Sequence, residues 1–344
     1  MSGTVQDRSP GNQPLLQVDS LRIEIPNRRG TLLAVDDVSF HIDEGEVLGV
    51  VGESGAGKSL TGSAIIGLLE PPCHIAGGRI HLAGRRIDNL SYEQMRRIRG
   101  REIGMVFQDP LTSLNPLYTV GRQLTETILT HTDLGEKAAR ARAIELLQEV
   151  GIPAAAERID QYPHQFSGGM RQRVVIALAL CINPRLIIAD EPTTALDVSI
   201  QAQIIAVLKK LCREHGAAVM LVTHDMGVIA ETADRVAVMY AGRIVEIGPV
   251  ADVVLRAQHP YTAGLMGSIP LVGHDVEDLT QIDGAMPRLN AIPQGCAFNP
   301  RCPRAFERCR RERPDLQPVG ATQAACWLYD EQQARPARGS GTHG

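Results

Sequence analysis

The stretch Gly52-Glu53-Ser54-Gly55-Ala56-Gly57-Lys58-Ser59 follows the apolar run 47–51 and opens into residues 60–69, which have the composition of a helix. In this context of strand, glycine turn and helix, the pattern G-x-x-x-x-G-K-[ST] predicts a loop that binds phosphate groups. Glycines allow backbone N–H groups to surround an anion without a Cβ in the way. We expect Lys58 to contact the outer phosphates and Ser59 to contact Mg²⁺. The helix that continues from Leu60 would direct its positive end at the same anion.

Length and composition limit the classes of protein to which this chain can belong. The chain has 344 residues, 44% of them hydrophobic, enough for one large core or a core with an appendage. Its net charge of −4 gives no reason to expect a nucleic-acid partner, and the basic run 96–101 is typical of a solvated helix face. The longest apolar run, 174–182, is far shorter than the roughly 20 residues that cross a bilayer, and residues 1–14 show no signal-peptide pattern. We expect a cytoplasmic protein that reaches a membrane only through a partner.

The order of the expected elements predicts an α/β fold. The apolar runs 103–107, 186–189 and 217–223 are typical of buried strands, and the helical segments 170–182 and 200–215 lie between the later ones. Strands that alternate with helices indicate a mainly parallel sheet with both faces covered. The remaining expected elements are antiparallel edge strands at 16–25 and 34–42, a hairpin-like stretch at 77–84, helices at 92–99, 121–130 and 136–150, a loop at 110–116, and a hairpin at 234–247 that turns at Gly242.

The chain also changes character along its length. We expect a nucleotide-binding domain at 15–250, with a helical subdomain inserted at about 109–166. A C-terminal extension rich in Pro, Cys and Arg follows at 251–330. Residues 1–14 and 331–344 have the composition of disordered ends.

Two carboxylates follow the buried strand 186–189. Ligands of parallel sheets bind beyond the carboxyl ends of the strands, so Asp190 and Glu191 are expected beside the phosphate-binding loop. Asp190 suits Mg²⁺ coordination, through water, and Glu191 suits polarising the water that attacks the γ-phosphate of ATP. An Asp-Glu pair alone would more often be structural, and its pairing with the loop makes the interpretation strong.

Two further polar residues end neighbouring strands. Gln108 follows the strand 103–107 and is expected to touch Mg²⁺ or the attacking water. His224 follows the strand 217–223 and is expected to contact the γ-phosphate. Taken singly, each is more often a structural polar group at a strand end, so their roles depend on the rest of the site.

A second anion site is indicated by Phe166-Ser167-Gly168-Gly169-Met170-Arg171-Gln172. Ser167 is a favourable N-cap, and an apolar helix begins just after the glycines, which leaves its first N–H groups uncrowded. The alternative is an ordinary Ser-Gly-Gly cap. With this motif preceding the Asp190-Glu191 strand, the chain resembles the ABC-type ATPases, whose RecA-like P-loop NTPase core carries an antiparallel β edge and an inserted helical subdomain. In that resemblance Thr194-Ala195-Leu196-Asp197 corresponds to the D-loop, whose Asp197 belongs to the ATP site, and His224 to the switch histidine.

The resemblance implies a mechanism. Two such subunits face each other head to tail, and the ATP bound at 52–59 of one is covered by Ser167, Gly168 and Gly169 of the other. Hydrolysis removes the anion that holds the pair closed, and the dimer reopens. The helical subdomain and the loop at Gln108 would transmit this motion to membrane partners.

A narrower resemblance is to the ATP-binding subunits of the oligopeptide/dipeptide importers, and it covers about 16–328. It rests on the loop sequence 52–59, on Val-Phe-Gln-Asp-Pro-Leu-Thr-Ser-Leu-Asn-Pro at 106–116, on His-Pro-Tyr-Thr at 259–262 and on Gly-Cys-Ala-Phe-Asn-Pro-Arg-Cys-Pro at 295–303. It implies two transmembrane permeases, a second and non-identical ATPase subunit, an extracytoplasmic solute-binding protein as an indirect partner, and a place on the cytoplasmic face of the inner membrane. One departure is Ile25, which stands where the family has an aromatic residue that stacks on adenine.

Four of the seven cysteines cluster in the extension: Cys296, Cys302, Cys309 and Cys326. The other three, Cys73, Cys181 and Cys212, are typical of small buried hydrophobes. Zinc sites usually contain C-x₂₋₄-C pairs, which this cluster does not have, whereas four widely spaced thiolates allow an iron–sulfur cluster. Because the importer family has members with a [4Fe-4S] cluster at this motif, we expect one here, with zinc or free thiols as alternatives. The arginines around the motif are expected to balance its charge: Arg301, Arg304, Arg308, Arg310 and Arg311.

The alternative function is a soluble, mechanochemical ABC-type ATPase that is not coupled to transport. Such proteins typically have a long coiled-coil insertion or two nucleotide domains in one chain, and this sequence has neither. A non-hydrolysing regulatory subunit is disfavoured because Glu191 and His224 are both intact. The sequence does not indicate which solute is carried.

Overall fold

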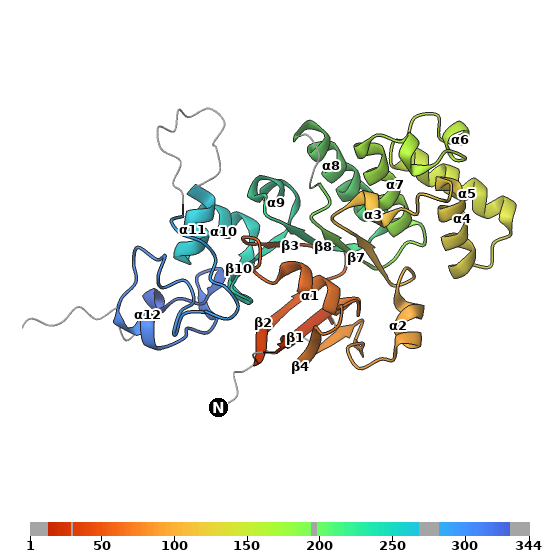
Figure 1. The fold of residues 1–344 in the computed structure, drawn as a ribbon. Helices are drawn as coiled ribbons and strands as arrows, with labels where there is room; N and C mark the ends of the chain where they lie inside the picture. The colour runs from red at the N-terminus through yellow and green to blue at the C-terminus, as the bar shows by residue number, and fades with distance from the viewer. Residues whose placement is uncertain (1–12, 29, 194–197, 268–281, 331–344) are drawn as a thin grey trace, which may run out of the picture.

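A computed structural model of the chain describes residues 13–28, 30–193, 198–267 and 282–330 (Figure 1). Within these ranges the main sheet has eight strands in the order β11-β12-β10-β9-β3-β8-β7-β6. The strands from β9 to β6 are parallel, as the alternation of strands and helices predicts, and β10, β12 and β11 continue the sheet antiparallel. The bounds are β3 Val47–Val51, β6 Ile103–Val106, β7 Leu186–Asp190, β8 Ala218–Thr223, β9 Arg235–Tyr240, β10 Arg243–Pro249, β11 Gln317–Val319 and β12 Thr322–Ala324.

The central strands divide their side chains between two cores. On β3, Val47 and Val51 face one core, and Leu48 and Val50 face the other. Every residue of β7 and β8 is buried. A parallel strand that is covered on both faces has no solvent side, so these runs are apolar without alternation.

A second, antiparallel sheet covers one face of the main sheet. Its order is β2-β1-β4-β5, with β1 Leu16–Asn27, β2 Gly30–Ile42, β4 His74–Leu82 and β5 Arg85–Arg86. β1 and β2 pair antiparallel as predicted, but they pair within this separate sheet and do not extend the main one. Helices α1 (Lys58–Ile65) and α2 (Tyr92–Ile98) share its core.

Helices cover the other face of the main sheet (Figure 1). They are α3 Pro110–Ser113, α4 Val120–His131, α5 Glu136–Glu149, α6 Ala155–Arg158, α7 Gly168–Leu180, α8 Val198–His215 and α9 Met226–Thr232, with a 3₁₀ turn at Pro163–Gln165. A loop is predicted at 110–116, but α3 forms there because Pro110 suits the first helical turn and the Asp109 carboxylate accepts the N–H of Leu111. None of the helices in the described ranges combines the length and apolar character needed to cross a membrane.

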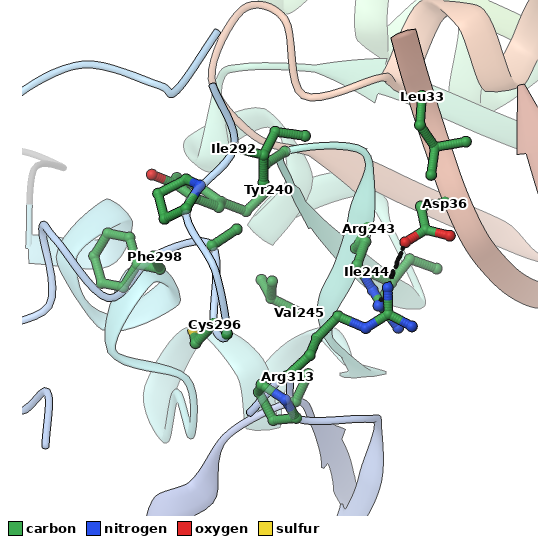
Figure 2. Close-up of a pocket in the computed structure, with 16 residues that line it drawn as sticks. Leu33, Asp36, Tyr240, Arg243, Ile244, Val245, Ile292, Cys296, Phe298 and Arg313 are labelled. Atoms are coloured by element: carbon green, nitrogen blue, oxygen red, sulfur yellow. Dashed lines mark hydrogen bonds and ion pairs between the residues drawn. The ribbon is translucent and has the colours of Figure 1, made fainter. Parts of the chain in front are cut away.

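The C-terminal extension is joined to the main sheet. It contains α10 Val250–Leu255, α11 Pro260–Gly267, α12 Glu307–Arg311, the strands β11 and β12, and a 3₁₀ turn at Trp327–Tyr329. β12 pairs with β10, with Glu246 opposite Ala324. A cavity of about 410 Å³ lies where the extension meets β2 and β10, and there Arg313 pairs with Asp36 at 2.6 Å (Figure 2). The extension therefore contacts both sheets.

Candidate functional site

The loop between β3 and α1 has the backbone that a phosphate-binding loop needs. Gly57, the N-cap of α1, has a φ of 99°, and Gly52 has a φ of 150°. A Cβ at Gly52 would lie 2.2 Å from the carbonyl oxygen of Met239, so no side chain fits at this position. The glycines at the two ends of the loop are thus explained by backbone conformation and close packing.

Lys58 is the first residue of α1, and its side chain lies along the inside of the loop. Its buried ammonium donates hydrogen bonds to the carbonyl oxygens of Gly52 (2.8 Å) and Glu53 (3.1 Å). Burial lowers the pKa of Lys58. The carboxylates of Glu191, Asp190 and Glu53 act in the opposite direction, which places the cation among three acidic groups.

Ser59 and Asp190 meet at the start of α1. The Ser59 hydroxyl donates a hydrogen bond of 2.8 Å to the Asp190 carboxylate at the end of β7. Burial raises the pKa of Asp190, and the Ser59 hydrogen bond partly offsets this. The pair presents a hydroxyl and a carboxylate at one point, and oxygen donors of this kind fit Mg²⁺.

The three residues predicted to be catalytic converge on one carboxylate. The Gln108 amide donates to Glu191 Oε2 at 3.1 Å, and His224 Nδ1 lies 3.5 Å from Glu191 Oε1. Glu191 has a φ of 45°, uncommon for a residue with a side chain, and its N–H donates to the Val222 carbonyl oxygen at 2.8 Å. The ends of β6, β7 and β8 therefore bring Gln108, Glu191 and His224 together.

A cavity of about 390 Å³ is lined by Lys58, Ser59, Gln108 and Glu191, among other residues. The loop and the start of α1 contribute to its lining, as do Ala34 of β2 and Met286-Pro287-Arg288-Leu289 of the extension. Ile25 pairs with Leu32 in the β1–β2 ladder and is not among the described residues that line the cavity. The contribution of 286–289 was not anticipated from the sequence, which offers no motif there.

The second predicted anion site lies apart from this cavity. Ser167 caps α7, because its hydroxyl accepts the N–H of Met170 at 3.3 Å, and the helix begins at Gly168. Ser167 and Gly168 are exposed, and among the described residues lining the cavity around Lys58 none comes from 167–169. Thr194–Asp197, predicted to include a site residue at Asp197, lie outside the described residues.

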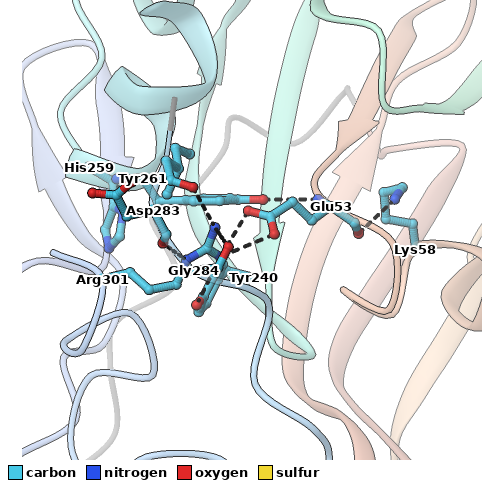
Figure 3. Close-up of polar contacts among 9 residues, drawn as sticks. Glu53, Lys58, Tyr240, His259, Tyr261, Asp283, Gly284 and Arg301 are labelled. Carbon is cyan, nitrogen blue, oxygen red and sulfur yellow. Dashed lines mark hydrogen bonds and ion pairs between the residues drawn. The ribbon is translucent and has the colours of Figure 1, made fainter. Parts of the chain in front are cut away.

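The extension touches the phosphate-binding loop directly (Figure 3). The N–H of Glu53 donates to the Tyr261 hydroxyl at 2.9 Å, and the Arg301 guanidinium pairs with the Glu53 carboxylate at 3.0 and 3.1 Å. Arg301 was expected to balance charge at the cysteines, but its side chain is directed at the loop instead. Tyr261 belongs to the motif at 259–262 and Arg301 to the motif at 295–303, but neither motif indicates what these side chains contact.

The four clustered cysteines line one small enclosed cavity in the extension, together with His259, Arg304 and Trp327. Burial raises the pKa of the Cys296 thiol to about 11, and the other three cysteines add to this effect. Arg304 is the arginine whose charge acts on Cys302 and Cys326. In the part of the chain that the structure describes, no three His, Cys, Asp or Glu side chains are grouped as a site for a single metal ion.

The fold and the loop define a P-loop ATPase of the α/β class. A family model described as ABC transporter matches residues 35–194, and one described as the C-terminal region of oligopeptide/dipeptide transporters matches 245–309. The oligopeptide transport ATP-binding protein AppD of Bacillus subtilis is 46% identical over 93% of this chain and 98% of its own length. The dipeptide transport ATP-binding protein DppD of Escherichia coli is 44% identical over 94% and 99%.

Solved structures of ATP-binding cassettes have the same fold as this chain. The ATP-binding cassette MJ0796, a dimer in a post-hydrolysis state bound to ADP and Pi, is 29% identical with a TM-score of 0.62 over 68% of this chain and 98% of its own. The cassette cbiO1 from Clostridium perfringens is similar, with a TM-score of 0.61 over 71% and 91%. This chain belongs to the family of ATP-binding proteins of oligopeptide/dipeptide ABC transporters, and it is an ABC-type ATPase. The resemblance and fold class predicted from the sequence are confirmed.

Proposed function

We propose that this chain is the ATP-hydrolysing subunit of an ABC importer that takes up peptides or a related solute. The observation that carries the proposal is the match of residues 245–309 to the C-terminal region of oligopeptide/dipeptide transporters, because that region is additional to the ABC match at 35–194. Relatives whose names specify oligopeptide or dipeptide transport align over nearly the whole chain.

The residues around the loop have the chemistry for hydrolysis. Glu191 would accept a proton from the water that attacks the γ-phosphorus, while ADP leaves with the bridging oxygen. Gln108 and His224, both in contact with Glu191, would orient that water and the γ-phosphate. The backbone N–H groups of the loop and Lys58 would hold the phosphates. Ser59, Gln108 and Asp190 would hold Mg²⁺, which neutralises charge on the phosphates when bound.

The base of ATP would lie against the residues of the extension that line the cavity. β2 contributes Ala34 to the cavity wall, and a methyl group offers little stacking surface. In the extension, Met286 packs on both cores, and Pro287 and Leu289 add apolar surface to the cavity lining. The Arg288 side chain adds a cation that stacks well on an aromatic ring. These residues take the place of the aromatic side chain that Ile25 does not supply.

The complete site would form between two subunits. Ser167 and Gly168 at the N-terminus of α7 are exposed, and neither they nor Gly169 are among the described residues that line the cavity at their own loop, which suits a triphosphate held by an opposing subunit. Asp197 would lie at the same junction. The opposing subunit would be a second, related ABC ATPase, and ATP would hold the pair closed until hydrolysis.

The helical region 109–166 would carry the motion to two transmembrane permeases. Large apolar side chains are exposed next to Gln108, where Phe107, Leu111 and Leu117 are 43%, 63% and 78% exposed. Exposed apolar groups of this size suit contact with another protein. The chain would thus work at the cytoplasmic face of the inner membrane, with an extracytoplasmic binding protein delivering the solute and no nucleic acid involved.

The four-cysteine cavity would hold a [4Fe-4S] cluster through Cys296, Cys302, Cys309 and Cys326. Four thiolates enclosed together repel one another, and bound metal supplies the balancing positive charge. A single zinc ion would need its sulfurs about 3.8 Å apart, given Zn–S bonds of about 2.3 Å. The support for this proposal is that all four cysteines line one cavity, as the ligands of a single cluster must. When bound, the cluster would cross-link the extension.

Anaerobically purified protein should be brown and contain iron and sulfide, and a colourless, zinc-loaded protein would contradict the assignment.

The test of function is ATP hydrolysis by the chain purified with and without its permeases. The complex should show vanadate-sensitive hydrolysis, and Glu191→Gln should lower the rate by about a hundredfold or more while keeping ATP bound. Glu70→Gln, a change at an exposed position outside the helical region 109–166, is the matched control and should hydrolyse normally. Normal turnover by Glu191→Gln would contradict the assignment of the base, and an unchanged rate with permeases present would contradict coupling to transport.

A further inference from the structure

Glu53 places a carboxylate in the loop that is assigned to bind phosphates. Its carboxylate belongs to a loop whose purpose is to bind a triphosphate, and its charge already acts on Lys58. Like charges at short range and partial burial repel strongly, because little water screens them. Glu53 left alone would therefore weaken the binding of phosphates at this loop.

Arg301 neutralises this carboxylate from outside the nucleotide domain. Its side chain is only 8% exposed, and Nη1 donates to both oxygens of Glu53. Nε donates to the Asp283 carbonyl oxygen at 2.8 Å and Nη2 to the Gly284 carbonyl oxygen at 3.3 Å (Figure 3). The guanidinium is thus held by the extension backbone, so it is already oriented toward Glu53.

A second group from the extension fixes the backbone of the same residue. The Glu246 carboxylate, fully buried on β10, accepts the N–H of His259 at 2.8 Å. The His259 ring accepts the N–H of Tyr261 at 3.1 Å, and the Tyr261 hydroxyl accepts the N–H of Glu53. This series of hydrogen bonds connects β10 of the main sheet to the loop, and its first three residues, Glu246, His259 and Tyr261, are buried. The extension therefore holds Glu53 by both its N–H and its carboxylate.

We propose that Arg301 is a positioning residue of the ATP site, which sets the affinity of the phosphate-binding loop for nucleotide by neutralising Glu53. The inference rests on the assignment of residues 52–59 as the loop that binds the phosphates of ATP. The competing explanation is that the ion pair only attaches the extension to the core. The two explanations predict different effects on nucleotide affinity. If the charge of Glu53 matters, removing Glu53 and removing Arg301 have opposite effects on the affinity. If attachment of the extension matters, both changes weaken nucleotide binding.

The test measures the dissociation constant of ADP and of a non-hydrolysable ATP analogue by titration calorimetry on the full chain. We expect Arg301→Ala to bind about tenfold or more weakly, because the repulsion by Glu53 is unmasked. Glu53→Gln should bind at least as tightly as the wild type, and the double variant Glu53→Gln/Arg301→Ala should recover most of the loss. The defect of Arg301→Ala should shrink as salt is raised, because salt screens the repulsion.

Arg310→Ala is the matched control, because Arg310 is an exposed arginine of the same extension and its removal changes the net charge equally. It should bind nucleotide like the wild type. The proposal is overturned if Arg301→Ala binds normally, or if the double variant is as weak as Arg301→Ala. Should Arg301→Ala fail to fold, Glu53→Gln alone decides, since weaker binding by that variant overturns the proposal. Lys58→Ala tests the assignment of the loop separately from the role of Arg301. Normal nucleotide binding by Lys58→Ala would refute the assignment of residues 52–59 as the phosphate-binding loop, whatever the result for Arg301→Ala.

Discussion

At the residue scale, Glu191 shows how a strained backbone places a functional group. A non-glycine residue in the left-handed region costs about 1–3 kcal/mol, which neighbouring structure must offset. The bond from the Glu191 N–H to Val222 on β8 holds this conformation, and it directs the carboxylate between Gln108 and His224. The polar residues after apolar runs could be located from the sequence, because strand ends are readable. The backbone angle could not, since it depends on the neighbouring strand.

The glycines of the loop give a prediction at the same scale. Gly52→Ala should lower the free energy of unfolding by about 2–4 kcal/mol, because the added Cβ meets the Met239 carbonyl oxygen and the backbone is also strained. Gly55→Ala is the matched control: Gly55 has a φ of 83°, but a Cβ there meets nothing within 4 Å. It should lose only about 1–2 kcal/mol. Urea unfolding of the two variants checks this, and equal losses would contradict the steric explanation.

The cysteines of the nucleotide-binding domain give a second prediction at the residue scale. Burial raises the pKa of Cys181 and Cys212 to about 12, so very little thiolate exists at pH 8 and both thiols are shielded from reagent. Cys73 is only partly buried. Iodoacetamide at pH 8 should therefore label Cys73 before Cys181 and Cys212, and leave those two unmodified until the protein is unfolded in urea. Peptide mass spectrometry gives the order, and early labelling of Cys212 would show that the core opens more readily than its packing indicates.

At the scale of elements, the N-termini of α7 and α4 have similar cap geometry, but only that of α7 is proposed to contact nucleotide. Ser167 caps α7 and Thr119 caps α4, with hydrogen bonds of 3.3 and 3.2 Å to the N–H three residues on. Each hydroxyl should contribute about 1 kcal/mol to stability. If α7 also covers the nucleotide of an opposing subunit, its cap has a second role that the cap of α4 does not have.

Ser167→Ala and Thr119→Ala separate these roles. Both should lower the free energy of unfolding by about 1 kcal/mol, but only Ser167→Ala should lower ATP hydrolysis by the assembled complex, by about tenfold or more. Thermal unfolding and steady-state hydrolysis measured on the same preparations check the prediction. Equal hydrolysis by the two variants would mean that the N-terminus of α7 has no part in the closed site.

At the scale of the whole molecule, the extension is the part that the sequence describes least well. The central strands and helices were predictable because apolar runs and periodicity are local signals, and α7 and β7 lie within two residues of their predicted ends. The pairing of β12 with β10 and the contacts of Tyr261 and Arg301 with Glu53 join residues more than 70 positions apart. No local pattern encodes such contacts. The extension appears in the sequence as a cysteine motif, and in the structure as a continuation of the sheet and one wall of the nucleotide cavity.

This arrangement predicts that the cysteine cavity and the nucleotide site are coupled. Cys296 and Cys302 border the segment that carries Arg301, so a change that loosens the cavity should also release the partner of Glu53. With the proposed cluster bound, Cys309→Ser should reduce the iron content, lower the melting temperature by about 4 °C or more and weaken ADP binding several-fold. Elemental analysis, differential scanning fluorimetry and titration calorimetry measure the three effects on one preparation.

Cys212→Ser is the control for this coupling, since Cys212 is also buried but lies in α8 and not at the cavity. It should lower the melting temperature, because a hydroxyl replaces a buried thiol, and leave iron content and ADP affinity unchanged. If Cys309→Ser loses its iron and still binds ADP as tightly as the wild type, the extension is a passive attachment. If affinity falls with the loss of iron and is restored when Glu53→Gln is added, the route from the cysteine cavity to the loop runs through the charge of Glu53.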